Sequence, residues 1–476
     1  MPCAPVHPTH PHHDHPPPDP RRWTVLALIC VAQFMLVLDV TVVNVALPDM
    51  AADLALDRAT LTWVVASYTL CFGGLMLLGG RLADALGARR TLLAGLAIFT
   101  AASLFTGLAQ NAPALIGGRV AQGVGAALLS PAALAIVTTG FHGAERNKAL
   151  GVWAAIGGTG SAAGVLLGGA LTAGPGWPWV FYVNVPVGLA LLAALPALVP
   201  ARAPWPVRLD VPGALLVTTA TGTLIYGLVR AGDSGWSDPL TLLALIGAVA
   251  LYGGFAAVER STREPLMDLT MLTRRPVVAG SFLMLIATAL LISYFFLSSV
   301  HLQHIRGFSP METGLIFLPV AVAVALGAHL GSRLVGRIGS RASAVGSLTV
   351  AAAGSTLLTF APTAANVYIT LLPGLAVASL GIGAVFVTAT TTALAMVAQE
   401  EAGLASGVVN TFHEVGGSVG VAMVSTAAAT GIAQGTSAGF TGAYTLLAVT
   451  AAISAALCVA LVPRGKPQLT GGVHVH

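Results

Sequence analysis

Long apolar stretches recur along the whole chain, each about as long as a bilayer is thick. A transmembrane helix needs about 20 mainly apolar residues. Only 8% of the 476 residues are charged, whereas soluble domains carry about 25%. The composition excludes a soluble enzyme, a disordered chain and a nucleic-acid-binding module, and it predicts an all-α membrane protein. Fourteen spans are expected, at 23–47, 61–80, 90–109, 112–139, 148–172, 179–199, 211–230, 239–258, 276–300, 312–332, 342–361, 366–396, 403–430 and 440–462.

Basic residues orient these spans. If the N-terminus is placed inside, the inner segments hold eighteen of the 22 lysines and arginines, the outer segments hold three, and Arg119 lies within a span. Cytoplasmic loops carry an excess of Lys and Arg. Both termini are therefore expected in the cytoplasm.

An internal repeat divides the chain. The segment Gly80–Arg89 is echoed at Ser332–Arg341, an offset of 252 residues, and the same offset carries Gly164 onto Gly416. Paired halves with a site between them are typical of secondary transporters. The repeat predicts a tail at 1–22, a six-helix half at 23–200, an inserted helix pair with linkers at 201–275, a second half at 276–462 and a tail at 463–476. The first tail is rich in His without regular ligand spacing, which favours disorder over a metal site.

Two groups of ionisable residues lie in apolar runs, where charge is costly and marks function. Asp39 and Arg119 are expected at similar depths from the outer surface, about 13 and 10 Å at 1.5 Å per residue, so a pair or a water-bridged relay is permissible. Glu414, beside His413, is about 16 Å from the inner surface by the same rise. Asp39, His413 and Glu414 are candidate proton carriers, Arg119 is a candidate switchable partner of Asp39, and His413 and Glu414 are also a candidate site for a cationic substrate. The alternative for each is a structural hydrogen bond between helices, and for Asp39 also a place in the outer interface near Pro48.

Several ordered motifs resemble the major facilitator superfamily, and within it the fourteen-span drug:proton antiporters. They are Leu38–Pro48, the loop at 80–90, Arg119-Val120-Ala121-Gln122-Gly123-Val124-Gly125, Gly160–Gly169, Trp179–Gly188 and Gly403–Gly407 with Asn410-Thr411-Phe412. Within that family, the sequence resembles actinobacterial antibiotic-resistance exporters, such as those for methylenomycin or puromycin. The sequence departs from the pattern at Val165, where proline is usual, at Pro178, where arginine is usual, and at His413-Glu414, where Arg-Gln is common.

The resemblance implies further roles. Arg81, Asp84 and Arg89 would form a latch that closes the cytoplasmic side, and it would be one-sided because Gly336 replaces the aspartate in the second copy. The glycines of the antiporter motif in the fifth span are expected to permit tight helix packing; they are Gly160, Gly164, Gly168 and Gly169. By contrast, Ser309-Pro310-Met311-Glu312 fits a capping box, so we expect Glu312 to be structural.

Polar and aromatic residues of the spans are candidates to line a substrate cavity; they are Phe34, Asn44, Trp63, Tyr68, Gln122, Tyr294, Phe296 and Asn410. No phosphate loop, HExxH or GxSxG motif occurs, so we expect neither an enzyme nor an ATP-driven pump, and no cofactor or metal.

The sequence thus predicts an exporter of small hydrophobic or cationic drugs, driven by protons through alternating access. It would act as a monomer in a bacterial cytoplasmic membrane, with a small-molecule substrate, the lipid bilayer around it and no nucleic acid. A metabolite exporter for an amino acid, siderophore or lipid is the first alternative. A non-transporting membrane sensor or scaffold is the second, and it would favour a large soluble domain, which the loops are too short to form.

Overall fold

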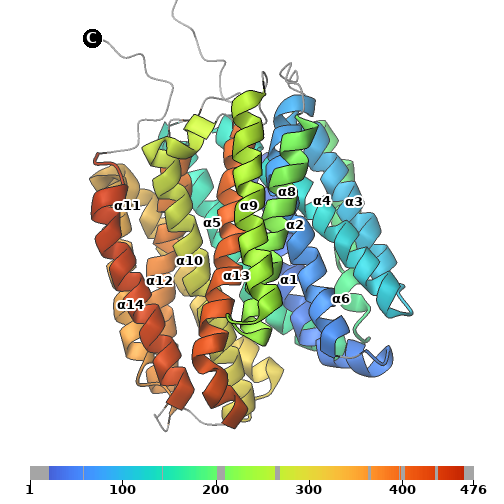
Figure 1. Cartoon of the computed structure of the whole chain (residues 1–476), viewed down its shortest axis with the longest axis vertical. Helices are drawn as coiled ribbons and strands as arrows, with labels where there is room; N and C mark the ends of the chain where they lie inside the picture. Colours follow the sequence, from blue (N-terminus) through green and yellow to red (C-terminus); the bar gives the residue numbers. More distant parts are fainter. Residues whose placement is uncertain are drawn as a thin grey trace, which may run out of the picture.

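The structure is a computed structural model, which describes residues 21–56, 58–141, 143–200, 210–262, 269–362, 366–395, 397, 402–434 and 438–465. The two predicted disordered tails lie almost wholly outside these residues. Helices form throughout the described part of the chain (Figure 1). This confirms the expected all-helical fold.

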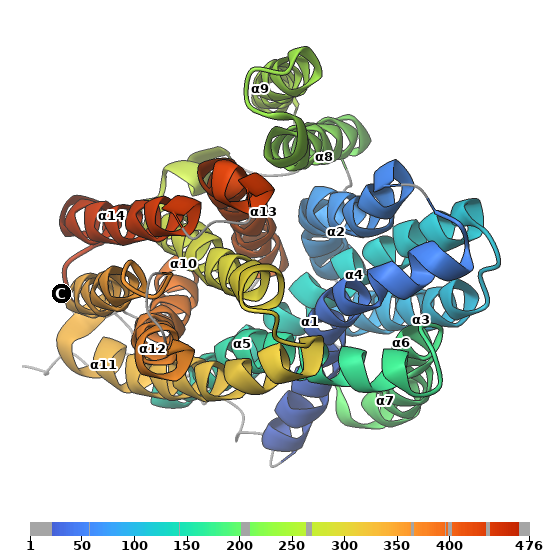
Figure 2. The ribbon, with the colours of Figure 1, turned by 90° about the horizontal axis from the view of Figure 1, so that it is seen from below.

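The helices gather into two bundles with a pair outside them (Figure 2). The first bundle comprises α1 (Arg22–Asp53), α2 (Arg58–Leu86), α3 (Ala88–Gly107), α4 (Ala112–Gly140), α5 (Gly143–Ala173), the one-turn α6 (Trp179–Tyr182) and α7 (Asn184–Leu198). The second comprises α10 (Arg275–Val300), α11 (Pro310–Leu358), α12 (Val367–Ala393), α13 (Ala402–Gln434) and α14 (Ala438–Leu461). The pair is α8 (Val211–Ser234) and α9 (Pro239–Ser261). Short turns at Leu269–Thr273 and His301–Ile305 flank α10.

Side-chain caps begin several of these helices. The Oδ1 of Asn111 accepts a hydrogen bond from the Ala114 N–H at the start of α4, and Asp210 caps α8 in the same way. At α11 the predicted capping box is present: the Glu312 N–H donates to Ser309 Oγ at 3.2 Å, and the Ser309 N–H donates to Glu312 Oε2 at 2.7 Å. Such caps satisfy backbone donors that a helix leaves unpaired at its start. The structural role expected for Glu312 is confirmed.

The internal repeat is visible in the backbone. Gly87, between α2 and α3, has φ of 93°, and Gly339, which is 252 residues later, has φ of 84°. Residues with a Cβ rarely adopt this conformation. The sharp bend at Gly339 divides α11 into two helices, which correspond to the predicted spans 312–332 and 342–361.

Eleven helices in the described part of the chain are long and apolar enough to cross a membrane, with α11 taken as one. The predicted spans 148–172 and 403–430 fall on α5 and α13. A multi-pass membrane protein is therefore supported, whereas the total of fourteen spans stays a prediction.

The bundles meet mainly where α2 packs on α13 and α5 packs on α11, with smaller contacts of α4 with α13 and of α5 with α12. The hydrogen bonds that cross this seam at the end expected to face the cytoplasm include one from Asn410 Nδ2 to Ser130 Oγ at 3.4 Å and one from Arg146 Nη2 to the Leu394 carbonyl at 3.0 Å. Gly407 allows α13 to lie directly against the backbone of Met76 on α2. The bundles are thus in close contact at this end.

The inserted pair lies over the same seam. Helix α8 packs against α2 and α13 (Figure 2). Tyr226 of α8 stacks on Trp63 of α2 with ring centroids 5.9 Å apart, and Trp236 Nε1, beyond α8, donates to Thr426 Oγ1 of α13 at 3.0 Å. The pair therefore joins both bundles instead of extending one of them.

Candidate functional site

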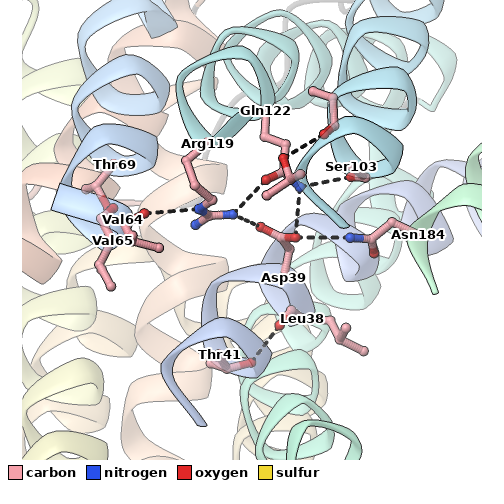
Figure 3. A network of polar contacts seen from close by, with 12 residues as sticks. Leu38, Asp39, Thr41, Val64, Val65, Thr69, Ser103, Arg119, Gln122 and Asn184 are labelled. Carbon is pink, nitrogen blue, oxygen red and sulfur yellow. Dashed lines mark hydrogen bonds and ion pairs between the residues drawn. The ribbon is translucent and has the colours of Figure 1, made fainter. Parts of the chain in front are cut away.

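Asp39 lies at the centre of a buried polar network in the first bundle (Figure 3). An Arg119 Nη1 donates to Asp39 Oδ2 at 2.5 Å. Gln122 Nε2 and Asn184 Nδ2 both donate to Asp39 Oδ1, at 3.1 and 3.0 Å. Both carboxylate oxygens thus have donors, and these come from α4 and α7.

The donors are themselves held in place. Arg119 Nη1 also donates to Gln122 Oε1 at 3.0 Å, and Arg119 Nε donates to the Val64 carbonyl of α2 at 3.1 Å. Gln122 Nε2 contacts Ser103 Oγ of α3 at 2.8 Å. The guanidinium also stacks on the Tyr68 ring, 4.2 Å from its centroid. The network therefore ties α1, α2, α3, α4 and α7 together.

The network excludes water. The exposed fraction is 0% for the Asp39 side chain and 1% for that of Arg119. Burying two charges is costly unless they pair well and their remaining atoms are hydrogen-bonded. Here both carboxylate oxygens and the Nε and Nη1 atoms of the guanidinium have hydrogen-bond partners. In this conformation the Asp39–Arg119 ion pair is therefore shielded from solvent, and its hydrogen-bond partners among the described residues lie within the first bundle.

Three glycines spaced four residues apart bring α5 against the α1 segment that carries Asp39. A Cβ on Gly160 would meet Val37, one on Gly164 would meet Thr41, and one on Gly168 would meet Val42 and Val45. Gly416 and Gly420 of α13 approach α10 in the same way. The expected packing role is thus seen for these three motif glycines, whereas Gly169 is only half-buried.

We predict that Gly164→Ala displaces α1 and weakens the Asp39 network. The new Cβ would overlap Thr41 Oγ1 and lie 2.8 Å from Thr41 Cβ, and such overpacking costs about 1–3 kcal/mol. Thermal unfolding in detergent measures the loss. Gly117→Ala in α4 is the control, because a Cβ there meets nothing within 4 Å; equal melting temperatures for the two variants would contradict the prediction.

Glu414 and His413 lie on α13 of the second bundle, outside the Asp39 network. His413 Nδ1 is 3.0 Å from Thr288 Oγ1 of α10, and its ring lies 5.8 Å from that of Phe386 on α12, so it is tied into the second bundle. Glu414 lies on the α2 side of α13, since a Cβ on Gly73 would be 3.2 Å from Glu414 Cβ and 2.5 Å from Ile225 Cδ1 of α8.

The Glu414 carboxylate forms no hydrogen bond or ion pair with any residue that the structure describes. The residue is only half-buried. A carboxylate in a membrane usually pairs with another group. Of the two candidate acids, Glu414 is therefore the one whose charge is available to a proton or a cation.

The predicted cavity residues fall in different places. Gln122, Tyr68 and Tyr294 are fully buried, so they do not line an open cavity in this conformation: Gln122 is used in the network, and the Tyr294 hydroxyl lies 2.5 Å from Ser355 Oγ. Phe34 and Phe296 are half-buried against apolar clusters. Trp63 is 43% exposed, Asn410 spans the seam, and the side chain of Asn44 lies outside the described residues.

The predicted latch residues lie where α2 meets α3. Asp84 is buried and Arg81 is half-buried. An Arg89 Nη2 donates to the Pro196 carbonyl of α7 at 2.6 Å, a contact within the first bundle. The hydrogen bond from Arg146 to the Leu394 carbonyl crosses the seam near the same end, and Arg146 was not among the residues expected in the latch.

Asn184 and Ser103, two members of the Asp39 network, were not among the residues predicted from the sequence. Asn184 lies in the Trp179–Gly188 motif, and an amide in an apolar span is a usable signal. Ser103 gives no such signal, because serine side chains often bond to their own helix backbone.

Two helical bundles that meet at a seam are the architecture of a secondary transporter. Here one bundle holds a buried ion pair, and the Glu414 carboxylate beside the seam has no partner among the described residues. The family model for the Major Facilitator Superfamily matches residues 29–421, and the chain belongs to this family.

Curated relatives agree with this assignment. The chain is 43% identical to the puromycin resistance protein pur8 of Streptomyces alboniger, covering 86% of this chain and 82% of the relative. It is 35% identical to a lincomycin resistance protein of Streptomyces lincolnensis, covering 84% and 83%. It is 34% identical to the tetracenomycin C resistance and export protein of Streptomyces glaucescens, covering 86% and 76%. The expected resemblance to actinobacterial resistance exporters is confirmed.

Solved structures agree on the fold. The human organic anion transporter MFSD10 has a TM-score of 0.67 at 15% identity, covering 92% of this chain and all of that one. The proton:xylose symporter XylE has a TM-score of 0.67 at 16% identity, covering 94% and 97%. At these identities the likeness shows the fold alone.

Proposed function

We propose that the protein exports small hydrophobic or cationic compounds, antibiotics among them, across the cytoplasmic membrane in exchange for protons. The names of the relatives support antibiotic export. The observation that carries the mechanism is the contrast between the two acids: Asp39 is fully hydrogen-bonded, and Glu414 has no partner in the described chain.

In the proposed cycle, Glu414 accepts a proton from outside or binds a cationic substrate from inside, but not both. Each ligand favours the conformation in which it binds better. The Asp39–Arg119 network holds the first bundle rigid while the bundles change their relative tilt. The coupling ion is a proton, and we propose no cofactor and no metal. We further propose that the protein acts as a monomer with both termini in the cytoplasm.

Transport in reconstituted vesicles tests this function. Purified protein is placed in lipid vesicles with an imposed pH gradient, and accumulation of the fluorescent cation ethidium and of puromycin is followed. We expect both to accumulate against their gradients and to stop when an ionophore collapses the pH gradient. Accumulation of an amino acid or siderophore but of neither drug would favour the metabolite exporter, and no transport of any compound would favour the sensor.

A further inference from the structure

The hydroxyl group of Tyr68 on α2 is buried without a partner. The residue is 1% exposed, and its oxygen forms no hydrogen bond with any residue in the described part of the chain. A buried polar atom left unpaired costs about 1–3 kcal/mol. Such an atom calls for an explanation, and one explanation is a bond made in another state of the protein.

The ring of Tyr68 is already engaged with the ion-pair network. The Arg119 guanidinium lies 4.2 Å from the ring centroid, an attractive cation–π arrangement. Val64, one turn earlier on α2, accepts the hydrogen bond from Arg119 Nε. A movement of Tyr68 would therefore change the contacts of Arg119, the ion-pair partner of Asp39.

Tyr68 and Glu414 lie on helices α2 and α13, which pack together across the seam. Glu414 Cβ lies against α2 at Gly73, five residues after Tyr68. The charge in contact with the Tyr68 ring is that of Arg119 on α4, whose counterion is Asp39 of α1. Among the described residues, the two packed helices thus carry a buried hydroxyl, that of Tyr68, and a carboxylate, that of Glu414, that have no hydrogen-bond partner.

We propose that Tyr68 is a positioning residue that couples the two acids, through a hydrogen bond from its hydroxyl to the ionised Glu414 carboxylate in another state of the transport cycle. The bond stabilises the form of Glu414 that binds a cation. Because the ring carries Arg119, forming or breaking the bond changes the environment of the Asp39 pair. This inference rests on the proposed function and adds a link between the bundles.

Tyr68→Phe tests the link, because it removes the hydroxyl and keeps the ring under Arg119. Ethidium binding to purified protein is measured by fluorescence for the wild type, Tyr68→Phe, Glu414→Gln and the double variant. A hydrogen bond to a charged group is worth about tenfold or more in affinity, so Tyr68→Phe should weaken ethidium binding about tenfold. In the Glu414→Gln background it should change nothing.

Tyr294→Phe is the matched control. It removes the hydroxyl of another fully buried tyrosine, which is bonded to Ser355 inside the second bundle. Added to the wild type or to Glu414→Gln, it should leave the ethidium affinity of that background unchanged.

Three results would overturn the link: wild-type affinity for Tyr68→Phe, an equal loss in both backgrounds, or an equal effect of Tyr294→Phe. In each case vesicle transport by the wild type would leave the proposed function standing. If the wild type binds and transports neither ethidium nor puromycin, the proposed function fails and the link fails with it.

Discussion

Asp39→Asn is expected to destabilise the protein strongly. The substitution leaves the Arg119 charge at 1% exposure without its counterion, and removing one partner of a buried ion pair costs about 3–5 kcal/mol. The loss should be seen as a lower melting temperature and a lower midpoint of denaturant unfolding. Transport should fall as well, since α1, α4 and α7 meet at this carboxylate.

Two further variants make this result specific. The double variant Asp39→Asn with Arg119→Gln removes both charges and should recover part of the lost stability, because no unpaired charge stays buried. Asp238→Asn is the matched control: Asp238 pairs with Arg230 at 2.7 Å near the surface, at 20% and 29% exposure, and exposed pairs contribute little. If Asp39→Asn melts like the wild type, the network does not hold the first bundle together.

Glu414→Gln, unlike Asp39→Asn, is expected to leave the stability of the protein unchanged and to abolish proton-driven accumulation of substrate. No hydrogen bond of the described chain is lost with this carboxylate, so the melting temperature should stay close to that of the wild type. A pH gradient of about one unit is worth about 1.4 kcal/mol per proton, enough for about tenfold accumulation of ethidium at one proton per molecule. The variant should equalise ethidium across the membrane without accumulating it.

Glu312→Gln is the control for this experiment. It removes the charge of another glutamate, the one in the capping box of α11, and should leave accumulation unchanged. Equal accumulation by the wild type and Glu414→Gln would show that protons are coupled elsewhere.

The fold was largely predictable because its signals are local. Apolar length marks the spans, and the repeat of Gly87 at Gly339 marks the same bend in both halves. The similar expected depths of Asp39 and Arg119 permitted the contact between them that the structure shows, but did not require it. By contrast, span depth does not tell which way a side chain faces, so Tyr294 and Gln122 were expected in a cavity and are buried instead.

For a similar reason, the sequence could not predict that the Glu414 carboxylate has no partner among the described residues. Whether a carboxylate finds a donor depends on which helices pack against it, and here these are α2 and the inserted α8. Nothing in the spacing of residues placed α8 over the seam. The inserted pair was expected, but its contacts with both bundles are a property of tertiary packing.

Proton release on drug binding shows whether proton and cation compete for Glu414. Ethidium is added to purified protein in weakly buffered detergent solution, and the pH change is recorded with a dye. If proton and cation compete for Glu414, binding near the middle of its titration releases about half a proton per ethidium, and the release rises toward one proton at lower pH. Glu414→Gln releases none even at saturating ethidium. The same release from Glu414→Gln as from the wild type would contradict the account.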